Sequence, residues 1–428
     1  MKKLDRSTKN QLAYIAEAAF EYFIALLITG AFLASILANI GVPDSVTGVI
    51  STLTSLGFSA QLVAVLFIKP KGSVKKMVTI MHVVNQLMFV TLYLIPYVNV
   101  PQGVKVVLFV IMFLGGHLIA NSATPFKLTW LMSYVHNNDR GKFTANKEIV
   151  SLIGGMVFSY VMGAVIDHYD AIGQSRTGFV ISGITIFALM LLHLWSLVCV
   201  KDDEDAQMVA TKPSESRSVK SILDCTIFDK GFRKIIYLDM LWHVGTGLTV
   251  SFYGTYQINE LGFSLSYVAV LAAMHSLVRV AFSRFFGKMA DRLSWARMLM
   301  FSFAIGAAAF LANTFTVPAN GKWLYAVYYA IFAIYLAGSN SGMMNIVFDY
   351  VERDNLSYAL GVKSAIGGIV GFTSSLLGAW IVSTVQAHGN TIFGHTIYAQ
   401  QIMSFVSFVM FAVIVVYIKK IILKMKRT

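Results

Sequence analysis

Two long apolar runs are separated by a dense charged turn, Gly287-Lys-Met-Ala-Asp291-Arg292-Leu-Ser294-Trp-Ala-Arg297. One run extends from Val268 to Phe286 and the other from Met298 to Leu311. Each is close to the length that crosses the hydrocarbon part of a bilayer as a helix. The sequence therefore predicts two neighbouring transmembrane helices joined by a short polar turn.

The residue types in this turn suit a contact that forms and breaks. Gly287 has no side chain and would allow two helices to approach closely near the membrane surface. The Asp291 carboxylate could meet the positive N-terminal end of another helix, and Arg292 and Arg297 could pair with acids or helix C-termini. We therefore predict a gate at these four positions, with Asp291 beside Arg140 or Lys147. The alternative is a tight turn that only obeys the positive-inside rule.

Composition places the chain among membrane proteins. Of its 428 residues, 57% are apolar and only 13% are charged, and the mean hydropathy is +0.68. Soluble domains have about 25% charged residues. The net charge of +13 is therefore not evidence of nucleic-acid binding, and the two cysteines predict neither a disulfide framework nor a metal site. No cofactor is expected.

Hydropathy predicts twelve spans, with boundaries defined to within several residues. They cover residues 14–38, 46–68, 77–97, 104–131, 147–168, 178–200, 232–257, 267–287, 297–316, 323–348, 358–384 and 396–418. The predicted fold class is an all-α membrane protein with two pseudo-symmetric six-helix bundles. The bundles would comprise residues 1–200 and 231–428, joined by a polar cytosolic linker over 201–230.

The basic residues orient these spans. If both termini are cytosolic, the inner segments carry 29 of the 34 lysines and arginines, and the outer loops carry only three, Lys105, Arg176 and Lys322. This asymmetry follows the positive-inside rule. It predicts a multi-pass protein of the plasma (inner) membrane with both termini in the cytosol.

Two sequence matches relate the halves. Gly41-Val-Pro-Asp-Ser45 after the first span corresponds to Gly262-Phe-Ser-Leu-Ser266 after the seventh, and Ile153-Gly154-Gly155 corresponds to Ile366-Gly367-Gly368. Internal duplication of this kind is frequent in secondary transporters. The glycine pairs also predict close helix approach, since glycine has no side chain. They are not part of a phosphate-binding loop, because no Lys-Ser/Thr follows Gly154.

The charged turn resembles the loop signature of the major facilitator superfamily at Gly287, Asp291 and Arg292. Ser294 stands where that signature has a second glycine, and Arg297 lies one place later than the usual basic pair. The resemblance extends over almost the whole chain through the twelve spans in two halves. It implies a secondary transporter that alternates between inward- and outward-open states around a central site lined by spans 1, 4, 7 and 10. The subfamily is not placed.

Polar residues within these spans are the candidate substrate ligands, since polar groups in hydrocarbon are costly and often functional. Span 7 carries a polar stripe at helical spacing, and spans 4 and 10 carry further polar and aromatic residues. The candidates are His117, Asn121, Trp242, His243, Thr246, Tyr253, Tyr335 and Asn340. Hydrogen bonding between packed helices is the alternative role for the same residues.

Two carboxylates are candidates for proton coupling. Glu21 in span 1 and Asp239 in span 7 occupy roughly corresponding positions of the two halves. We favour Glu21 because Glu17 lies on the same helical face and would repel a second negative charge. Glu17 is interpreted as sitting at headgroup depth, and Lys127 as extending toward the cytosol.

These observations predict proton-coupled symport of a small polar organic solute, for example a sugar-like one, by a monomer in the lipid bilayer. The partners are the solute and a proton or other coupling ion, with no nucleic acid. No hydrolytic, phosphoryl-transfer or dinucleotide motif occurs, so an enzyme is not expected. One alternative is an exporter of amphipathic compounds, which a cavity lined by Met and Phe with Asp239 facing lipid would favour. The other is a membrane sensor that keeps the fold without turnover.

Overall fold

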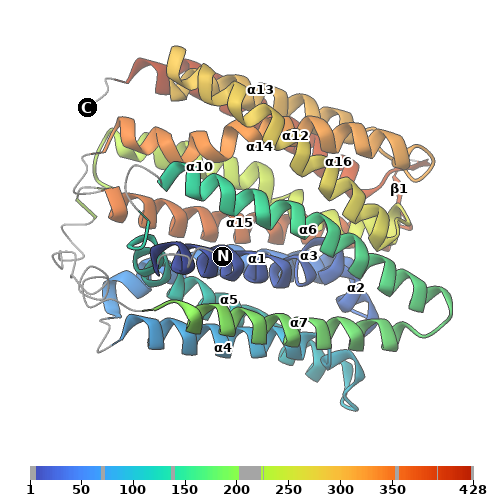
Figure 1. Cartoon of the computed structure of the whole chain (residues 1–428). Helices are drawn as coiled ribbons and strands as arrows, with labels where there is room; N and C mark the ends of the chain where they lie inside the picture. The colour runs from blue at the N-terminus through green and yellow to red at the C-terminus, as the bar shows by residue number, and fades with distance from the viewer. Residues whose placement is uncertain are drawn as a thin grey trace. The chain divides into compact units, whose positions relative to one another are not determined.

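The computed structural model describes residues 6–68, 73–135, 140–201, 223–224, 226–351, 356–392 and 394–425. It is helical apart from one two-stranded antiparallel hairpin, β1 (Thr391–Ile392) with β2 (His395–Thr396) (Figure 1). The helices of the N-terminal half are α1 (Arg6–Leu27), α2 (Gly30–Ile40), α3 (Asp44–Phe67), α4 (Val74–Leu92), η1 (Ile95–Tyr97), α5 (Gln102–Met132), α6 (Arg140–Ala171) and α7 (Ser175–Cys199).

The C-terminal half has a similar series with one irregular stretch. Its helices are α10 (Phe232–Gly247), η3 (Val250–Phe252), α11 (Tyr253–Thr255), η4 (Tyr256–Glu260), α12 (Leu265–Arg292), α13 (Trp295–Asn313), α14 (Gly321–Asn345), η5 (Ile346–Asp349), α15 (Leu356–Ala387), α16 (Ala399–Lys420) and η7 (Ile422–Lys424). Helices therefore occupy all twelve predicted spans.

Nine helical segments among the described residues are long and apolar enough to cross a membrane. The pair α1 and α2, bent by 43°, would make a tenth span. The predicted spans 77–97 and 323–348 correspond to α4 and α14, which fall short of that apolarity. Both contain polar or tyrosine-rich faces that pack inside their own unit, as His82 and Tyr328 do.

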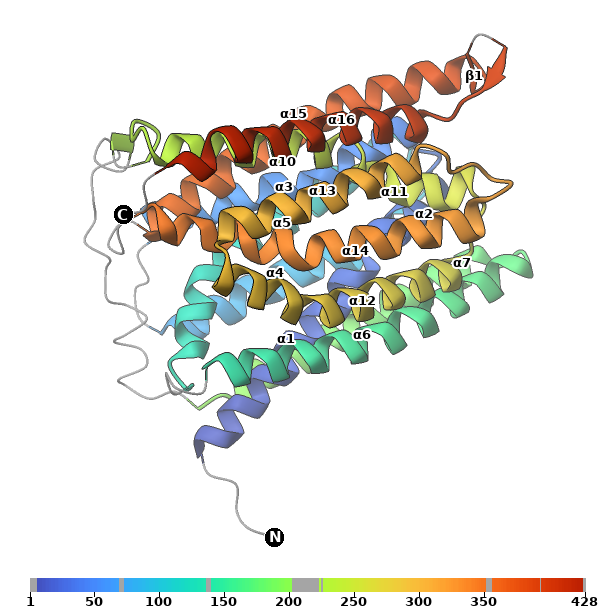
Figure 2. The ribbon, with the colours of Figure 1, turned by 90° about the horizontal axis from the view of Figure 1, so that it is seen from above.

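The chain divides into two compact units, each with its own core. The first comprises Met1–Val42, Ala60–Ser216 and Ser264–Ala269, and the second comprises Pro43–Ser59, Arg217–Phe263 and Val270–Thr428. In the first unit α1 packs against α6 and α7, and α4 packs against α5 and α7. In the second, α10 packs against α15 and α16, and α13 packs against α14 and α16 (Figure 2).

The duplicated segments form equivalent local structures. Gly41 and Gly262 both adopt left-handed backbone, with φ of +82° and +64°, and a helix starts three residues after each of them. Such φ values are readily adopted only by glycine. A Cβ at Gly155 would lie 2.5 Å from the Tyr22 ring of α1, and one at Gly367 would lie 2.6 Å from the His243 ring of α10. The predicted close approaches are therefore present on the equivalent helix pairs α1–α6 and α10–α15.

Two breaks interrupt the helices that open the halves. Between α1 and α2 the Tyr93 hydroxyl donates to the Leu27 carbonyl at 2.5 Å, which satisfies an acceptor at the break. After Gly247 the backbone passes through a 3₁₀ turn into a π-helix. Irregular backbone at membrane depth is tolerated only where it is buried in protein or lines a cavity, which makes the second break a marker for a site.

Candidate functional site

A polar cavity of about 220 Å³ lies in the second unit beside the break that follows α10. Six of its ten lining residues carry a hydroxyl group, and a single histidine joins them. The lining comprises Ser51, Thr52, Thr54, Ser55, His243, Thr246, Gly247, Val250, Ser251 and Gly371. Hydroxyl groups both donate and accept hydrogen bonds, so this wall suits an uncharged solute rich in hydroxyl or amide groups.

Glycines and the broken helix place α3 against α10 and α15. A Cβ on Gly247 would lie 2.7 Å from the Gly371 carbonyl oxygen, and one on Gly368 would lie 2.3 Å from the Ser55 carbonyl oxygen. The Ser251 carbonyl, at the irregular turn, accepts a hydrogen bond from the Ser51 hydroxyl at 2.8 Å. The cavity wall therefore depends on three segments distant in sequence, which only glycine allows to approach so closely.

An ion pair adjoins this cavity. The Lys363 ammonium lies 2.8 Å from Oδ1 of Asp239, whose side chain is only 1% exposed. Nδ1 of His243 lies 2.9 Å from the Asp239 carbonyl oxygen and 3.4 Å from its Oδ2. Because both neighbours of Nδ1 are acceptors, this nitrogen carries the proton. His243 thus connects a buried carboxylate to the cavity wall.

The first unit contains a larger buried cluster. The Lys127 ammonium donates to Glu17 Oε1 at 2.8 Å and also to Glu21. Nε2 of His193 lies 3.1 Å from the same Glu17 oxygen, and its Nδ1 lies 2.6 Å from the Gln86 amide. This arrangement fits a neutral His193 protonated at Nε2.

Glu17, Glu21 and His82 place three potential metal ligands within 4.8 Å of one another. The Lys127 ammonium already sits between the two carboxylates. A cation from solution would have to displace it, so the cluster is better described as an internal ion network than as a metal centre.

The structure gives Glu17 and Lys127 partners that the sequence did not predict. The Glu17 side chain is 1% exposed and is paired with Lys127 and His193, whereas Glu21 is 37% exposed. The Lys127 ammonium is bound by two carboxylates inside the unit. A hydropathy profile considers each helix separately, so it cannot show that a charged residue of one span pairs with a residue of another span.

The predicted substrate residues separate into those that line the cavity and those that do not. His243 and Thr246 line it. Trp242 donates its indole N–H to the Tyr335 hydroxyl at 2.5 Å, and Tyr253 lies in a cluster of rings with Tyr328. Asn340 is exposed at the end of α14. Of the eight residues, only His243 and Thr246 contribute to this cavity.

The two candidates in the first unit form a different pair. Asn121 Oδ1 accepts a hydrogen bond from Gln61 at 2.8 Å, and its amide donates to the His117 carbonyl at 2.9 Å. The His117 ring packs edge-on against Phe113, with centroids 4.6 Å apart. These contacts are helix-packing interactions, and a role in binding for His117 and Asn121 stays a prediction.

Sequence reasoning missed the most informative residues. Lys363 counts among the inner basic residues by its position in the sequence, yet it is 8% exposed and paired with Asp239. The run Ser51-Thr-Leu-Thr-Ser55 falls inside a predicted apolar span. This run has four hydroxyl residues in five consecutive positions of a predicted membrane helix, which gives that helix a polar face. That polar face was the signal in the sequence that could have identified the cavity wall.

The charged turn has open space around its glycine. A Cβ built on Gly287 would meet no atom within 4 Å, and the gate role of the turn stays a prediction. Asp291, Arg292 and Arg297 are exposed. Ser294 has φ +155° and ψ +161°, and its hydroxyl caps α13 by accepting from the Arg297 N–H at 3.1 Å. This backbone region is populated essentially by glycine alone.

The long apolar helices define a multi-pass helical membrane protein. A family model described as Major Facilitator Superfamily matches residues 15–338 and 240–421, and the chain belongs to that family. No curated protein matches the sequence. The chain is therefore a membrane transporter by family, and its fold class is the one predicted.

Solved structures of that fold resemble it at low sequence identity. The nucleoside transporter NupG has a TM-score of 0.70 at 12% identity, covering 99% of this chain and 100% of that one. A D-xylose-proton symporter has 0.67 at 14%, with 95% and 96% covered. The inward-open xylose transporter XylE from E. coli has 0.66 at 13%, with 99% and 97% covered. Likeness at this identity is evidence of fold alone.

Proposed function

We propose that the protein is a proton-coupled secondary transporter of a small, uncharged solute rich in hydroxyl groups, such as a sugar or a nucleoside. The observation that carries this proposal is the hydroxyl-lined cavity and its contact, through His243, with the Asp239–Lys363 pair. Solute hydroxyls can pair with the wall, and the adjoining carboxylate can take up or release a proton. The structures of the same fold include a nucleoside transporter and a D-xylose-proton symporter, so the fold is one that carries solutes of this kind in other proteins.

Two alternative functions are an exporter of amphipathic compounds and a membrane sensor that does not transport. An exporter of amphipathic compounds would suit a cavity lined by Met and Phe and an Asp239 facing lipid. The cavity in the second unit is hydroxyl-lined, and Asp239 is buried beside Lys363. A transport measurement distinguishes a membrane sensor from a transporter. Saturable ligand binding without passage of the ligand into sealed vesicles would indicate a sensor.

The deciding experiment is uptake into proteoliposomes that contain the purified protein. Radiolabelled pentoses, hexoses and nucleosides are offered with and without an imposed pH gradient. We expect one of these classes to accumulate only when the gradient is present. Absence of uptake for every hydroxylated solute, with uptake of amphipathic cations instead, would contradict the proposal.

A matched pair of variants ties uptake to the cavity. Thr246→Val removes a wall hydroxyl while keeping side-chain shape, and one neutral hydrogen bond is worth about 0.5–1.5 kcal/mol. We expect a KM increase of roughly 2- to 12-fold for the transported solute. Thr373→Val makes the same change on the exposed side of α15, where the hydroxyl bonds only its own helix, and should leave KM unchanged.

A further inference from the structure

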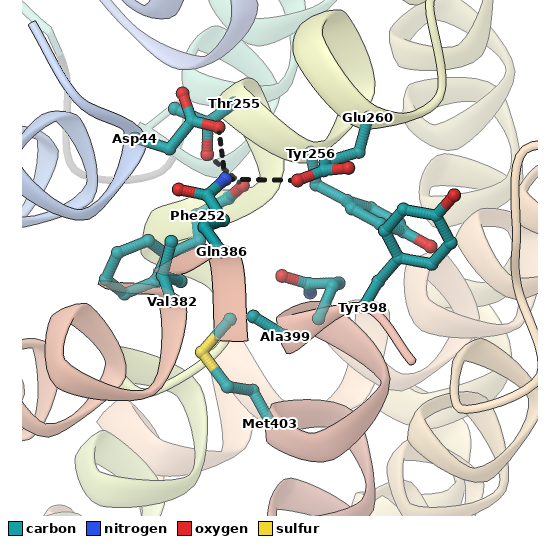
Figure 3. Close-up of a pocket in the computed structure, with 11 residues that line it drawn as sticks. Asp44, Phe252, Thr255, Tyr256, Glu260, Val382, Gln386, Tyr398, Ala399 and Met403 are labelled. Carbon is teal, nitrogen blue, oxygen red and sulfur yellow. Dashed lines mark hydrogen bonds between the residues drawn. The ribbon is translucent and has the colours of Figure 1, made fainter. Parts of the chain in front are cut away.

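A second, much smaller pocket lies in the same unit, between the start of α3, the π-helix η4, the end of α15 and the start of α16 (Figure 3). It is lined by Asp44, Phe252, Thr255, Tyr256, Glu260, Val382, Gln386, Tyr398, Ala399, Gln400 and Met403. None of these residues lines the hydroxyl-rich cavity. The pocket contains two carboxylates, which the transport proposal does not use.

The two carboxylates are held together by neutral donors. The Gln386 amide nitrogen donates to Asp44 Oδ2 at 2.8 Å and to Glu260 Oε1 at 3.0 Å (Figure 3). Asn259 donates to the other Asp44 oxygen at 2.5 Å, and Asn390 donates to the other Glu260 oxygen at 3.3 Å. An ionised carboxylate has about four lone-pair positions. Each acid therefore keeps acceptor capacity while its position is already defined.

No described lysine, arginine or histidine forms a salt bridge with either acid, whereas Glu17, Glu21 and Asp239 each have such a partner. Two like charges that share one amide donor repel each other. Positive charge placed between them would relieve that repulsion. The two buried ion clusters described above each contain a lysine beside their carboxylates, and this pocket contains none among the described residues.

An independent feature points to a ligand. Gln400 is only 2% exposed and lines the pocket, yet neither its amide oxygen nor its amide nitrogen has a hydrogen-bond partner. A buried unsatisfied polar group costs about 1–3 kcal/mol. Its neighbours on α16 do not share this state, since Gln401 bonds both the Thr314 carbonyl and the Tyr398 N–H. Gln400 thus offers a free amide oxygen to whatever enters.

The size of the pocket restricts its occupant. Its volume is about 20 Å³, and roughly 10–15 Å³ of such volume accommodates one water molecule. An organic solute does not fit, whereas a single ion does. Carboxylate and amide oxygens are the donors that hard cations such as Ca²⁺ and Mg²⁺ prefer. Mg²⁺ retains several waters, for which there is little space.

We propose that this pocket binds one hard metal cation, with Asp44, Glu260 and the Gln400 amide oxygen as ligands, and that its paired negative charge selects Ca²⁺ over Na⁺. Bound there, the cation joins three segments of the second unit, α3 through Asp44, η4 through Glu260 and α16 through Gln400. The site is separate from the solute cavity and does not depend on the transport proposal.

The probe for the test is Tb³⁺, which replaces Ca²⁺ at oxygen sites and luminesces when a nearby excited aromatic ring transfers energy to it. Tyr256 and Tyr398 line the pocket and supply that ring. Full-length protein in detergent is titrated with Tb³⁺ under tyrosine excitation, and bound Tb³⁺ is then displaced with CaCl₂ or NaCl at matched ionic strength. We expect Ca²⁺ to displace it at far lower concentration than Na⁺. Equal displacement by Na⁺ would overturn the selectivity.

Variants locate the signal. Asp44→Asn and Glu260→Gln should each weaken Tb³⁺ binding by at least about tenfold, the range in which disturbing a metal's ligand shell usually falls. Gln400→Glu adds a charged ligand and should tighten binding, an increase that misfolding could not produce. Asp170→Asn, an acid of the first unit, is the control. Luminescence that survives in the Asp44→Asn/Glu260→Gln protein, with an unchanged melting temperature, would refute the site.

Discussion

The two buried ion clusters consist of the same residue types but differ in the number of carboxylates that each lysine contacts. In the first unit one lysine, Lys127, is shared by two carboxylates, Glu17 and Glu21, with His193 as a further donor. In the second unit Lys363 faces the single carboxylate of Asp239. With neutral histidines the first cluster carries one excess negative charge and the second is balanced.

Their origins differ as well. The carboxylates come from α1 and α10, the helices that open the two halves, so duplication accounts for both. The lysines come from α5 and α15, which are spans 4 and 11 and do not correspond under that duplication. The carboxylate position is therefore shared by the halves, and each half supplies its compensating charge from a different helix.

Access to a cavity is the third difference. Asp239 contacts His243, which lines the hydroxyl-rich cavity, whereas Glu17 and Lys127 are enclosed by the helices of the first unit. We infer that the second cluster is the one placed to couple proton and solute, and that the first mainly holds α1 against α5. Glu21, the more exposed acid of the first cluster, stays the competing candidate for coupling.

The largest expected effect separates these two candidates. Asp239→Asn should abolish accumulation of solute driven by a pH gradient, because the amide cannot exchange a proton, while exchange at equal concentrations continues. Glu21→Gln should then reduce accumulation only partly. Both are measured in proteoliposomes. Full accumulation by Asp239→Asn, together with its loss in Glu21→Gln, would reverse the assignment in favour of Glu21.

Lys127→Met tests the holding role of the first cluster. Removing one partner of a buried ion pair costs about 3–5 kcal/mol, since the remaining charge is left uncompensated. We expect a marked fall in the melting temperature of the detergent-solubilised protein. The triple change Lys127→Met/Glu17→Gln/Glu21→Gln should recover much of that loss, and a triple variant as unstable as the single one would argue against charge as the cause.

Lys363→Met should be less destabilising than Lys127→Met, because it leaves one buried carboxylate without its lysine partner, whereas Lys127→Met leaves two. The same melting assay measures this difference. Adding Asp239→Asn should restore stability without restoring accumulation, which would separate the folding role of the pair from its transport role. A larger loss for Lys363→Met than for Lys127→Met would contradict the comparison.

The smallest effect is expected outside both clusters, at Ser294. Backbone held in this region costs about 1–3 kcal/mol for a residue other than glycine, while replacing a serine cap by glycine costs only a few tenths. Ser294→Gly should therefore raise the melting temperature slightly. Ser294→Ala keeps the backbone strain but loses the cap, so it should lower the melting temperature. A higher melting temperature for Ser294→Ala than for Ser294→Gly would exclude strain at this position.

The amino-acid sequence by itself determined the membrane class, the positions of the twelve helices and the duplication. Each of these depends on local pattern: apolar length, the places of basic residues, and glycines such as Gly41 and Gly262 whose φ no other residue adopts easily. The glycine pairs at 154–155 and 367–368 were predictable for the same reason, because close approach leaves a mark in the residue type.

Only the tertiary structure decided which polar residues meet. Glu17 and Lys127 are 110 positions apart, and Ser51 and Ser251 are 200 apart. No local pattern records such a pairing, because the free energy of a buried charge depends on what faces it from another helix. The same holds for Gln400, because the sequence does not show that its side chain is buried and that both of its amide atoms lack a hydrogen-bond partner.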